Sequence, residues 1–158
     1  MADLKKVTIY TDGGCIDNPG PGGYGVVLLF GEHRKELSGG FRRTTNNRME
    51  IMAALEGLRA LKIPCEVTLW TDSQYLQKSM SLGWVEKWRA KGWMRTPKEK
   101  ACNHDLWELM LEARAPHKVK FEWLKGHAGD QWNERCDELS TRAARLADLP
   151  IDIGYEEA

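Results

Sequence analysis

The order in which apolar patterns follow one another restricts the fold of this chain more than any other feature. Three segments with the alternating apolar pattern of β-strands come first, at 6–10, 24–30 and 34–41, and short turns join them. Helical and strand-like patterns then follow in the order helix, strand, helices, strand, helix. The sequence therefore predicts an α/β protein with helices packed on a mixed five-stranded sheet. The later elements are expected as a helix from the capping residues 44–47 to about 62, a strand at 65–70, short helices from 73 and at 84–91, a helix at 104–114 capped by Asn103, a strand at 119–123 and a helix at 132–146.

The length and apolar content are those of a single domain. The chain has 158 residues, of which 42% are hydrophobic. We expect its core over about 6–147 and a loose acidic tail at 148–158, because that segment lacks a helical pattern. No apolar run approaches the ~20 residues that span a bilayer, and the first residues lack the apolar stretch of a secretory signal. A cytoplasmic protein without a membrane partner is expected.

The cysteines give no sign of a zinc site or a disulfide framework. There are four, they lie far apart in the sequence, and none forms a CxxC pair. We expect reduced and partly buried thiols at Cys15, Cys65, Cys102 and Cys136.

Charge is balanced overall but unevenly distributed. Lys and Arg together number 23, as do Asp and Glu. The segment 86–100 nevertheless carries six basic and two acidic residues, a net charge of +4. A basic patch in a neutral protein is the electrostatic mark of a nucleic-acid surface.

Four carboxylates stand at positions that also have ordinary structural explanations. Asp12 and Asp72 follow apolar strands, Glu50 lies early in the first long helix, and Asp137 lies in the last helix. Asp12 could belong to a turn and Asp72 could cap the next helix. Glu50 could pair with Asn47 in a capping box, and Asp137 could lie on a solvated face. Carboxylates converging on one point would instead need hard divalent cations to balance their charge.

Six segments in a fixed order resemble bacterial ribonuclease HI, and the resemblance extends from about Val7 to Leu146. One such segment would carry little weight, but six in the family's order are specific. The segments are Tyr10-Thr11-Asp12-Gly13, Asn18-Pro19-Gly20-Pro21-Gly22-Gly23-Tyr24-Gly25, Thr44-Thr45-Asn46-Asn47-Arg48-Met49-Glu50, Thr71-Asp72-Ser73-Gln74-Tyr75, Lys125-Gly126-His127-Ala128-Gly129 and Asn133-Glu134-Arg135-Cys136-Asp137-Glu138-Leu139.

The resemblance implies a ribonuclease H-like fold, with three antiparallel strands followed by two parallel ones, and an endonuclease that hydrolyses the RNA strand of RNA–DNA hybrids. It implies that Asp12, Glu50, Asp72 and Asp137 hold two Mg²⁺ ions, which Mn²⁺ can replace. In-line displacement would leave 5′-phosphate and 3′-hydroxyl ends. The family's histidine, here His127, assists proton transfer or product release. A monomer without an obligate protein partner is expected.

The resemblance also assigns the grip on the hybrid. Recognition of the RNA 2′-hydroxyl falls to backbone groups near Cys15 and to side-chain amides, which both donate and accept hydrogen bonds. The amides are those of Asn18, Asn46, Asn47 and Gln74, although the asparagines could also serve as caps and turn residues.

The DNA strand is expected to meet Thr45 and Asn103, in a pocket that an arginine from the second strand often completes; Leu29 stands there in this chain. A basic handle is expected to carry further contacts, with packing as the alternative role of its tryptophans. Its residues are Trp84, Lys87, Trp88, Arg89, Lys91 and Trp93.

Two other functions remain open at this stage. A DNA-acting nuclease of the same fold would use similar carboxylates, and an inactive relative would bind hybrids without cutting them. A nucleotide-binding phosphate loop is excluded at 19–25, because the glycine-rich run lacks Gly-Lys-Ser/Thr.

Overall fold

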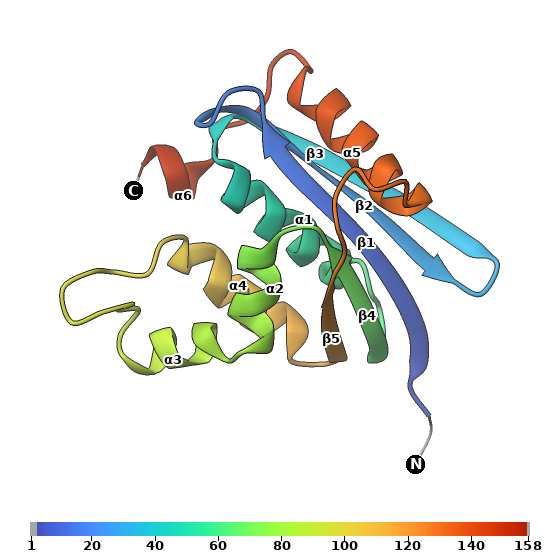
Figure 1. Ribbon diagram of the computed structural model, residues 1–158, viewed down its shortest axis with the longest axis horizontal. Coiled ribbons are helices and arrows are strands. Elements are labelled where there is room, and N and C mark those ends of the chain that lie inside the picture. Colours follow the sequence, from blue (N-terminus) through green and yellow to red (C-terminus); the bar gives the residue numbers. More distant parts are fainter. Residues whose placement is uncertain (1–2, 158) are drawn as a thin grey trace.

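A mixed five-stranded sheet forms the centre of the protein (Figure 1), whose computed structural model describes residues 3–157. The strands lie in the order β3-β2-β1-β4-β5. The first three pair antiparallel, whereas β4 runs parallel to β1 and β5 parallel to β4. This arrangement confirms the predicted sheet. The strands are β1 (Lys5–Cys15), β2 (Gly20–Phe30), β3 (His33–Thr44), β4 (Cys65–Thr71) and β5 (Lys118–Trp123).

Helices cover both faces of the sheet. Gly25 lies against α5 and its neighbour Val26 against α1, so these two helices pack on opposite faces, since successive residues of a strand point to opposite sides. Helix α4 packs behind α1. The helices are α1 (Asn46–Arg59), α2 (Gln74–Ser81), α3 (Trp84–Ala90), α4 (His104–Arg114), α5 (Gln131–Ala144) and α6 (Ile153–Glu156).

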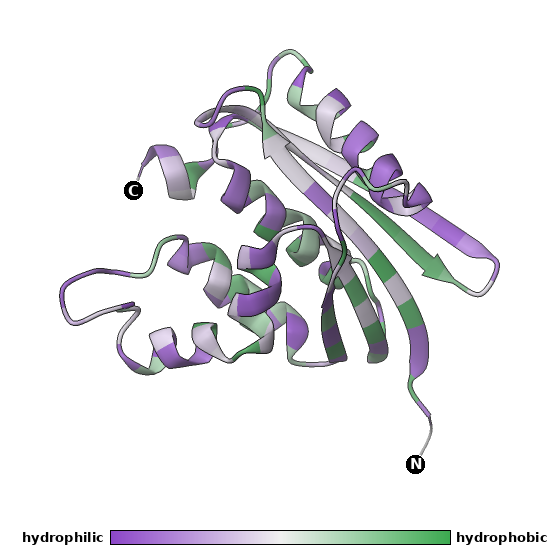
Figure 2. Cartoon of the chain, in the orientation of Figure 1, coloured by the Kyte–Doolittle hydropathy of each residue, from purple (hydrophilic) through white to green (hydrophobic). Residues whose placement is uncertain are grey.

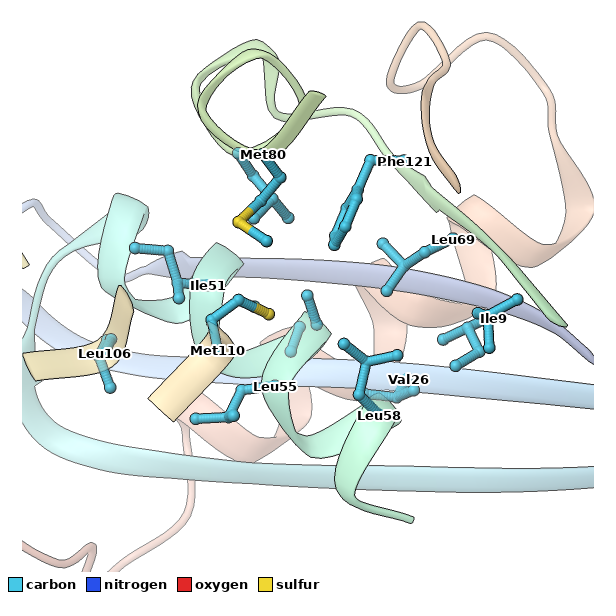
Figure 3. Close-up of a cluster of buried hydrophobic side chains, with 14 of the residues drawn as sticks. Ile9, Val26, Ile51, Leu55, Leu58, Leu69, Met80, Leu106, Met110 and Phe121 are labelled. Carbon is cyan, nitrogen blue, oxygen red and sulfur yellow. The ribbon is translucent and has the colours of Figure 1, made fainter. Parts of the chain in front are cut away.

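The core lies between the sheet and α1. Ile51, Leu55 and Leu58 recur at helical spacing and are buried in one cluster with Ile9 of β1 and Leu69 of β4 (Figure 3). Hydrophobic and hydrophilic residues alternate along β4 and β5, whereas most of α5 is hydrophilic (Figure 2). The periodic patterns therefore identify the faces that the structure buries.

β1 does not end at Asp12, as the adjacent glycines had suggested. It continues to Cys15, and Asp12 pairs with Gly25 of β2 in the middle of the ladder. A Cβ at Gly13 would overlap the backbone carbonyl of Met49 in α1. The glycine thus lets the start of α1 approach the strand and does not form a turn.

The helix starts show which residues act as caps. Thr45 Oγ1 accepts a hydrogen bond from the backbone N–H of Arg48 (3.2 Å) and caps α1, and Ser73 Oγ accepts one from Leu76 (3.1 Å) and caps α2. The capping alternatives for Glu50 and Asp72 are therefore wrong. Asn103 occupies the predicted cap position of α4, which spans His104–Arg114 as expected, but its side chain makes no capping hydrogen bond.

The C-terminal segment is not a loose tail. The backbone N–H of Arg42 in β3 donates to the carbonyl of Pro150 (2.9 Å), Asp152 is buried, and α6 follows. The sequence pattern missed this docking because polar contacts, and not an apolar stripe, hold the segment in place.

None of the helices within 3–157 has the length and apolar content of a membrane-spanning helix. The four cysteines are free thiols; Cys65 and Cys136 are buried and Cys15 is half-buried, whereas Cys102 is exposed and not partly buried as predicted.

Candidate active site

Three carboxylates from three elements converge at the centre of the sheet. Asp12 comes from β1, Glu50 from the second turn of α1, and Asp72 directly follows β4. One oxygen of each lies within 4.8 Å of the others. Asp12 and Glu50 are both only 7% exposed. The local reasons are the close approach at Gly13 and the parallel pairing of β1 with β4. Tyr10 pairs with Trp70, so Asp12 and Asp72, each two residues further along, come close together.

Asp137 lies in the wall of the same cleft, on α5, and does not belong to the tight group of three. Its charge nevertheless acts on Asp12. The structure thus brings together all four carboxylates that the sequence singled out, with three in a cluster and the fourth beside it.

Burial and mutual repulsion make this cluster hard to ionise. Burial, followed by the charges of Asp72 and Asp137, raises the pKa of Asp12 to about 8. Burial, followed by the charges of Asp12 and Asp72, raises the pKa of Glu50 well above its ordinary value. Glu50 Oε1 is buried and has no hydrogen-bond partner among the described residues. Buried polar atoms are rarely left in that state.

A divalent cation fits this group of side chains. All the donors are carboxylate oxygens, which are the ligands that Mg²⁺ and other hard cations prefer. A cation would give Glu50 Oε1 a partner and would offset the repulsion between the buried charges.

The loop after β5 closes one side of the site. A Cβ at Gly126 would lie 2.5 Å from Asp72 Oδ2, so this glycine lets the loop pass directly over the carboxylate. Trp123 Nε1 donates to the backbone carbonyl of Asp72 (3.1 Å) and fixes the end of β4. His127 follows in the same loop with a positive φ of 56° and lines the cleft.

The cleft has a volume of about 750 Å³ and contains most of the residues expected to read the RNA strand. Cys15, Asn46, Asn47 and Gln74 line it together with the carboxylates and His127. Asn18 lies behind them: its Oδ1 accepts from the backbone N–H of Asn46 (3.1 Å), and Asn46 Oδ1 accepts from the backbone N–H of Cys15 (2.8 Å). These bonds tie the β1–β2 turn to the start of α1.

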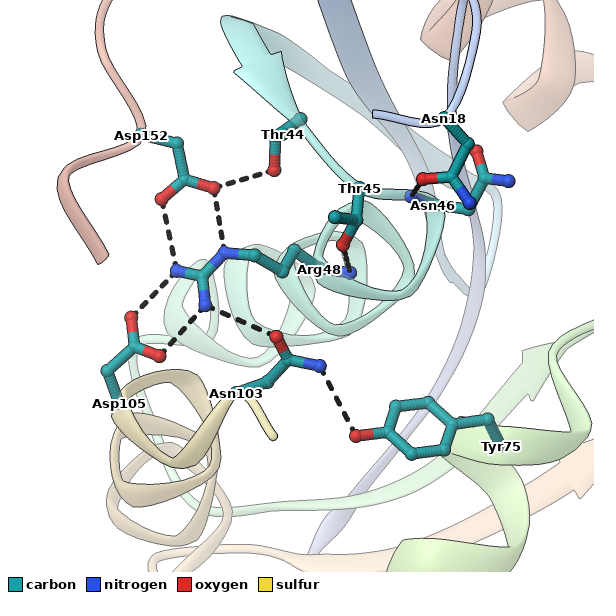
Figure 4. Close-up of polar contacts among 9 residues, drawn as sticks. All are labelled: Asn18, Thr44, Thr45, Asn46, Arg48, Tyr75, Asn103, Asp105 and Asp152. Atoms are coloured by element: carbon teal, nitrogen blue, oxygen red, sulfur yellow. Dashed lines mark hydrogen bonds and ion pairs between the residues drawn. The ribbon is translucent and has the colours of Figure 1, made fainter. Parts of the chain in front are cut away.

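Thr45 and Asn103 lie on either side of Arg48 (Figure 4). The Arg48 backbone donates to Thr45, and Arg48 Nη1 donates to Asn103 Oδ1 (3.4 Å). Leu29 is nowhere near them, so its assignment to this pocket is wrong. Leu29 pairs with Thr8 of β1 and Arg34 of β3. The residue of β2 that pairs with Thr44, next to Thr45, is Gly20, and Leu29 lies nine residues further along the strand. At about 3.3 Å per residue, that separation is roughly 30 Å.

A basic side chain does stand near Thr45, at Arg43. It is exposed and lies two residues earlier, at the end of β3. The expected arginine was placed on β2, far from this position. Proximity in sequence to Thr45 is the signal that could have found Arg43.

Packing accounts for the tryptophans of the handle, defined as residues 84–103. The rings of Trp84 and Trp88 lie 6.4 Å apart, and Trp88 lies 6.4 Å from Trp107 of α4. Trp93 Nε1 donates to Glu108 of α4 (3.1 Å). Trp84 stays 37% exposed. The cations between these tryptophans, Lys87, Arg89 and Lys91, are exposed.

The structure adds residues that were not among the expected site residues. Tyr75 lines the cleft beside Gln74, Ser140 and Thr141 line it from α5, and Arg145 lines it directly after that helix. The last three lie three, four and eight positions after Asp137, which is the spacing of one helix face. A helical projection from Asp137 could therefore have found them.

Comparison with known proteins agrees with this geometry. Residues 4–145 match the family model described as RNase H. The ribonuclease H of Syntrophus aciditrophicus is 62% identical over 151 residues, which cover 96% of this chain and 87% of that protein. The ribonuclease HI of a Synechocystis species is 53% identical over 152 residues, which cover 96% and 95%. The solved structure of LC9-RNase H1, described as a type 1 RNase H with the type 2 active-site motif, has a TM-score of 0.82 at 31% identity and covers 91% of this chain and 74% of that chain.

Proposed function

The chain belongs to the ribonuclease H family, and on that premise we propose that it hydrolyses the RNA strand of RNA–DNA hybrids, leaving 5′-phosphate and 3′-hydroxyl ends. The observation that carries the proposal is the group formed by the buried Asp12 and Glu50 and the half-buried Asp72, in a cleft whose rim presents side-chain amides. We further propose that it acts in the cytoplasm as a monomer.

The cofactor that we assign to this group is Mg²⁺, two ions of which Asp12, Glu50, Asp72 and Asp137 would hold, with Mn²⁺ as a substitute. A bound divalent ion lowers the pKa of a water molecule and stabilises negative charge on the leaving oxygen. The unpartnered Glu50 Oε1 and the all-oxygen donor set support this assignment.

The amides at the start of α1 would recognise the RNA strand. Asn46 Oδ1 is already engaged by the backbone of Cys15, so the Asn46 NH₂ group is the part left to donate to a 2′-hydroxyl. Asn47 and Gln74 lie on the same rim and offer both donors and acceptors. A substrate strand without 2′-hydroxyls would lose these bonds, which is the physical basis for preferring RNA at the scissile position.

His127 would move a proton at the leaving 3′ oxygen. Its loop passes over Asp72 at Gly126, so the imidazole lies at the edge of the cleft without belonging to the carboxylate group. An imidazole gains and loses protons near neutral pH, which suits this role. The role is auxiliary, because the side chain is exposed and water can also carry the proton.

The exposed cations of the handle, Lys87, Arg89 and Lys91, would contact the DNA backbone. Each phosphate that they neutralise releases counterions, so binding should weaken steeply as salt increases. Arg43 and Thr45 would contribute at the end of β3.

The decisive experiment compares an end-labelled RNA–DNA hybrid with duplex DNA and duplex RNA, each with Mg²⁺ and with a chelator. The expected result is cleavage of the RNA in the hybrid only, abolished by the chelator. Equal cutting of duplex DNA would instead favour a DNA-acting nuclease. Binding of the hybrid without cleavage at any metal concentration would favour an inactive binding module.

A further inference from the structure

A buried ion cluster joins the C-terminal segment to the start of α1, beside the residues expected to bind the DNA strand (Figure 4). Asp152 Oδ2 accepts hydrogen bonds from Thr44 Oγ1 (2.6 Å) and Arg48 Nε (2.8 Å). The side chains of Arg48 and Asp152 are each only 4% exposed. Thr44 directly precedes the cap residue Thr45, so Asp152 holds both sides of the β3–α1 junction.

Arg48 uses its whole hydrogen-bonding capacity in this cluster. A guanidinium has five N–H groups and no acceptor. Two of them donate to Asp152, at 2.8 and 3.0 Å, and two donate to Asp105 of α4, at 2.7 and 2.9 Å. The fifth donates to Asn103 Oδ1 at 3.4 Å, the longest of the five. The two carboxylates thus fix the direction of the guanidinium, and the remaining N–H points at Asn103.

This contact decides which end of the Asn103 amide is available. Because Arg48 can only donate, it requires the amide oxygen to face it and leaves the NH₂ group on the other side. There, Asn103 Nδ2 donates to the hydroxyl of Tyr75 (3.3 Å), and Tyr75 lines the active-site cleft. An NH₂ group has a second N–H, which can donate to an anion. The reverse orientation would turn an oxygen toward a phosphate and repel it.

We propose that Arg48 and Asp152 are positioning residues for the DNA strand, through which the C-terminal segment holds the Asn103 amide with its donor group ready for a phosphate. The inference rests on the proposed function, since it presumes a hybrid substrate. It assigns a task to a segment that stands outside residues 4–145, the part matched by the family model.

The fold of the C-terminal segment is adapted to this cluster. A Cβ at Gly154 in α6 would lie 2.5 Å from Arg48 Nη2 and would overlap the carboxylate of Asp105. The glycine therefore allows α6 to lie directly against the pair. A methyl group there would displace the guanidinium without removing any charge.

The test is steady-state hydrolysis of the hybrid by the full-length protein carrying Asp152→Asn. The amide keeps the size of the carboxylate but removes its charge, so Arg48 loses one of its two anchors. We expect KM to rise by about threefold to tenfold, the usual effect of losing one oriented hydrogen bond, with kcat within about twofold of wild type. Gly154→Ala should give the same change and serves as the second variant if Asp152→Asn does not fold.

A double-mutant cycle separates positioning from simple stabilisation. Asn103→Ala removes the group on which Asp152 is proposed to act. In that background Asp152→Asn or Gly154→Ala should cause no further rise in KM. Additive effects on KM, or a lowered melting temperature with wild-type KM, would overturn the proposal and leave a purely structural role.

The matched control is Glu156→Gln. Glu156 lies in the same segment and pairs with the exposed Arg42 (2.9 Å), whereas the five N–H groups of Arg48 donate to other residues, so KM should not change. Two failures can be told apart. If the wild-type protein does not cleave the hybrid, the proposed function fails. If it does, and both Asp152→Asn and Gly154→Ala keep the wild-type KM, only the present inference fails.

Discussion

Replacing Asp12 by asparagine should make the metal-free protein more stable while removing its activity. A carboxyl whose pKa is 3.8 in the unfolded chain and about 8 in the folded one destabilises the fold wherever the pH lies above the lower value. The cost is about 1.4 kcal/mol per pH unit, or roughly 4 kcal/mol at neutral pH. Asparagine has the same shape and no ionisation, so we expect a gain of about 2–4 kcal/mol in the free energy of unfolding.

The sign of the pH dependence follows from the same shift. Between about pH 4 and about pH 8 the folded state binds the proton of Asp12 and the unfolded state does not. The stabilisation from this proton is complete below the unfolded pKa and disappears as the pH rises through the folded pKa. In the presence of a chelator, the wild-type free energy of unfolding should therefore fall across this window, and that of Asp12→Asn should fall less.

Urea denaturation at several pH values, with a chelator throughout, measures both effects. Glu138→Gln is the control: it lies on α5 next to Asp137, but its side chain is 56% exposed, so its removal should change stability by less than about 0.5 kcal/mol. The reasoning is refuted if Asp12→Asn is no more stable than wild type at neutral pH in the chelator.

Three further outcomes are expected. Adding Mg²⁺ at pH values near 8 should raise the melting temperature of the wild type, because the ion binds the carboxylates of the folded state, and should have little effect on that of Asp12→Asn. Thermal scans with and without the ion measure this difference. His127→Ala should lower kcat by about 10- to 100-fold and leave KM near the wild-type value, as expected for loss of an auxiliary proton carrier; an inactive variant would make the histidine indispensable. Gly13→Ala should lower the free energy of unfolding, measured by urea titration, by more than about 3 kcal/mol, because the methyl group would overlap the backbone of Met49. A variant as stable as the wild type would show that α1 can move away from β1 at no cost.

The sequence predicted the elements because their signals are local. The alternation in β1, β4 and β5 and the helical spacing of Ile51, Leu55 and Leu58 were enough to give the order and the layers. The end of β1 was predicted wrongly because Asp12-Gly13-Gly14 has the composition of a turn. The real reason for Gly13, the approach of α1, involves a helix more than 30 residues later and leaves no trace in the local pattern.

The candidate site shows the same division. The four carboxylates were found because ordered motifs mark them, although each had an ordinary explanation when taken alone. Leu29 was misplaced and the C-terminal segment was expected to be loose because both depend on distant partners. Asp152 binds Arg48 across 104 residues, through polar contacts that no hydrophobic pattern records.

Helix α1 carries two buried charged groups, and the contrast between them supports a functional reading of the carboxylate cluster. Arg48 has all five N–H groups paired with Asn103 and with two carboxylates, so that buried charge is fully satisfied. Two residues later, Glu50 lies beside Asp12 with like charge and an oxygen that has no partner among the described residues. The fold thus neutralises the buried charge of Arg48, yet it leaves Glu50, two residues further along the same helix, without an opposite charge. The carboxylate cluster costs stability, whereas the ion cluster of Arg48 is fully paired. This difference is expected of a functional site whose charge is balanced by a divalent cation taken up from solution.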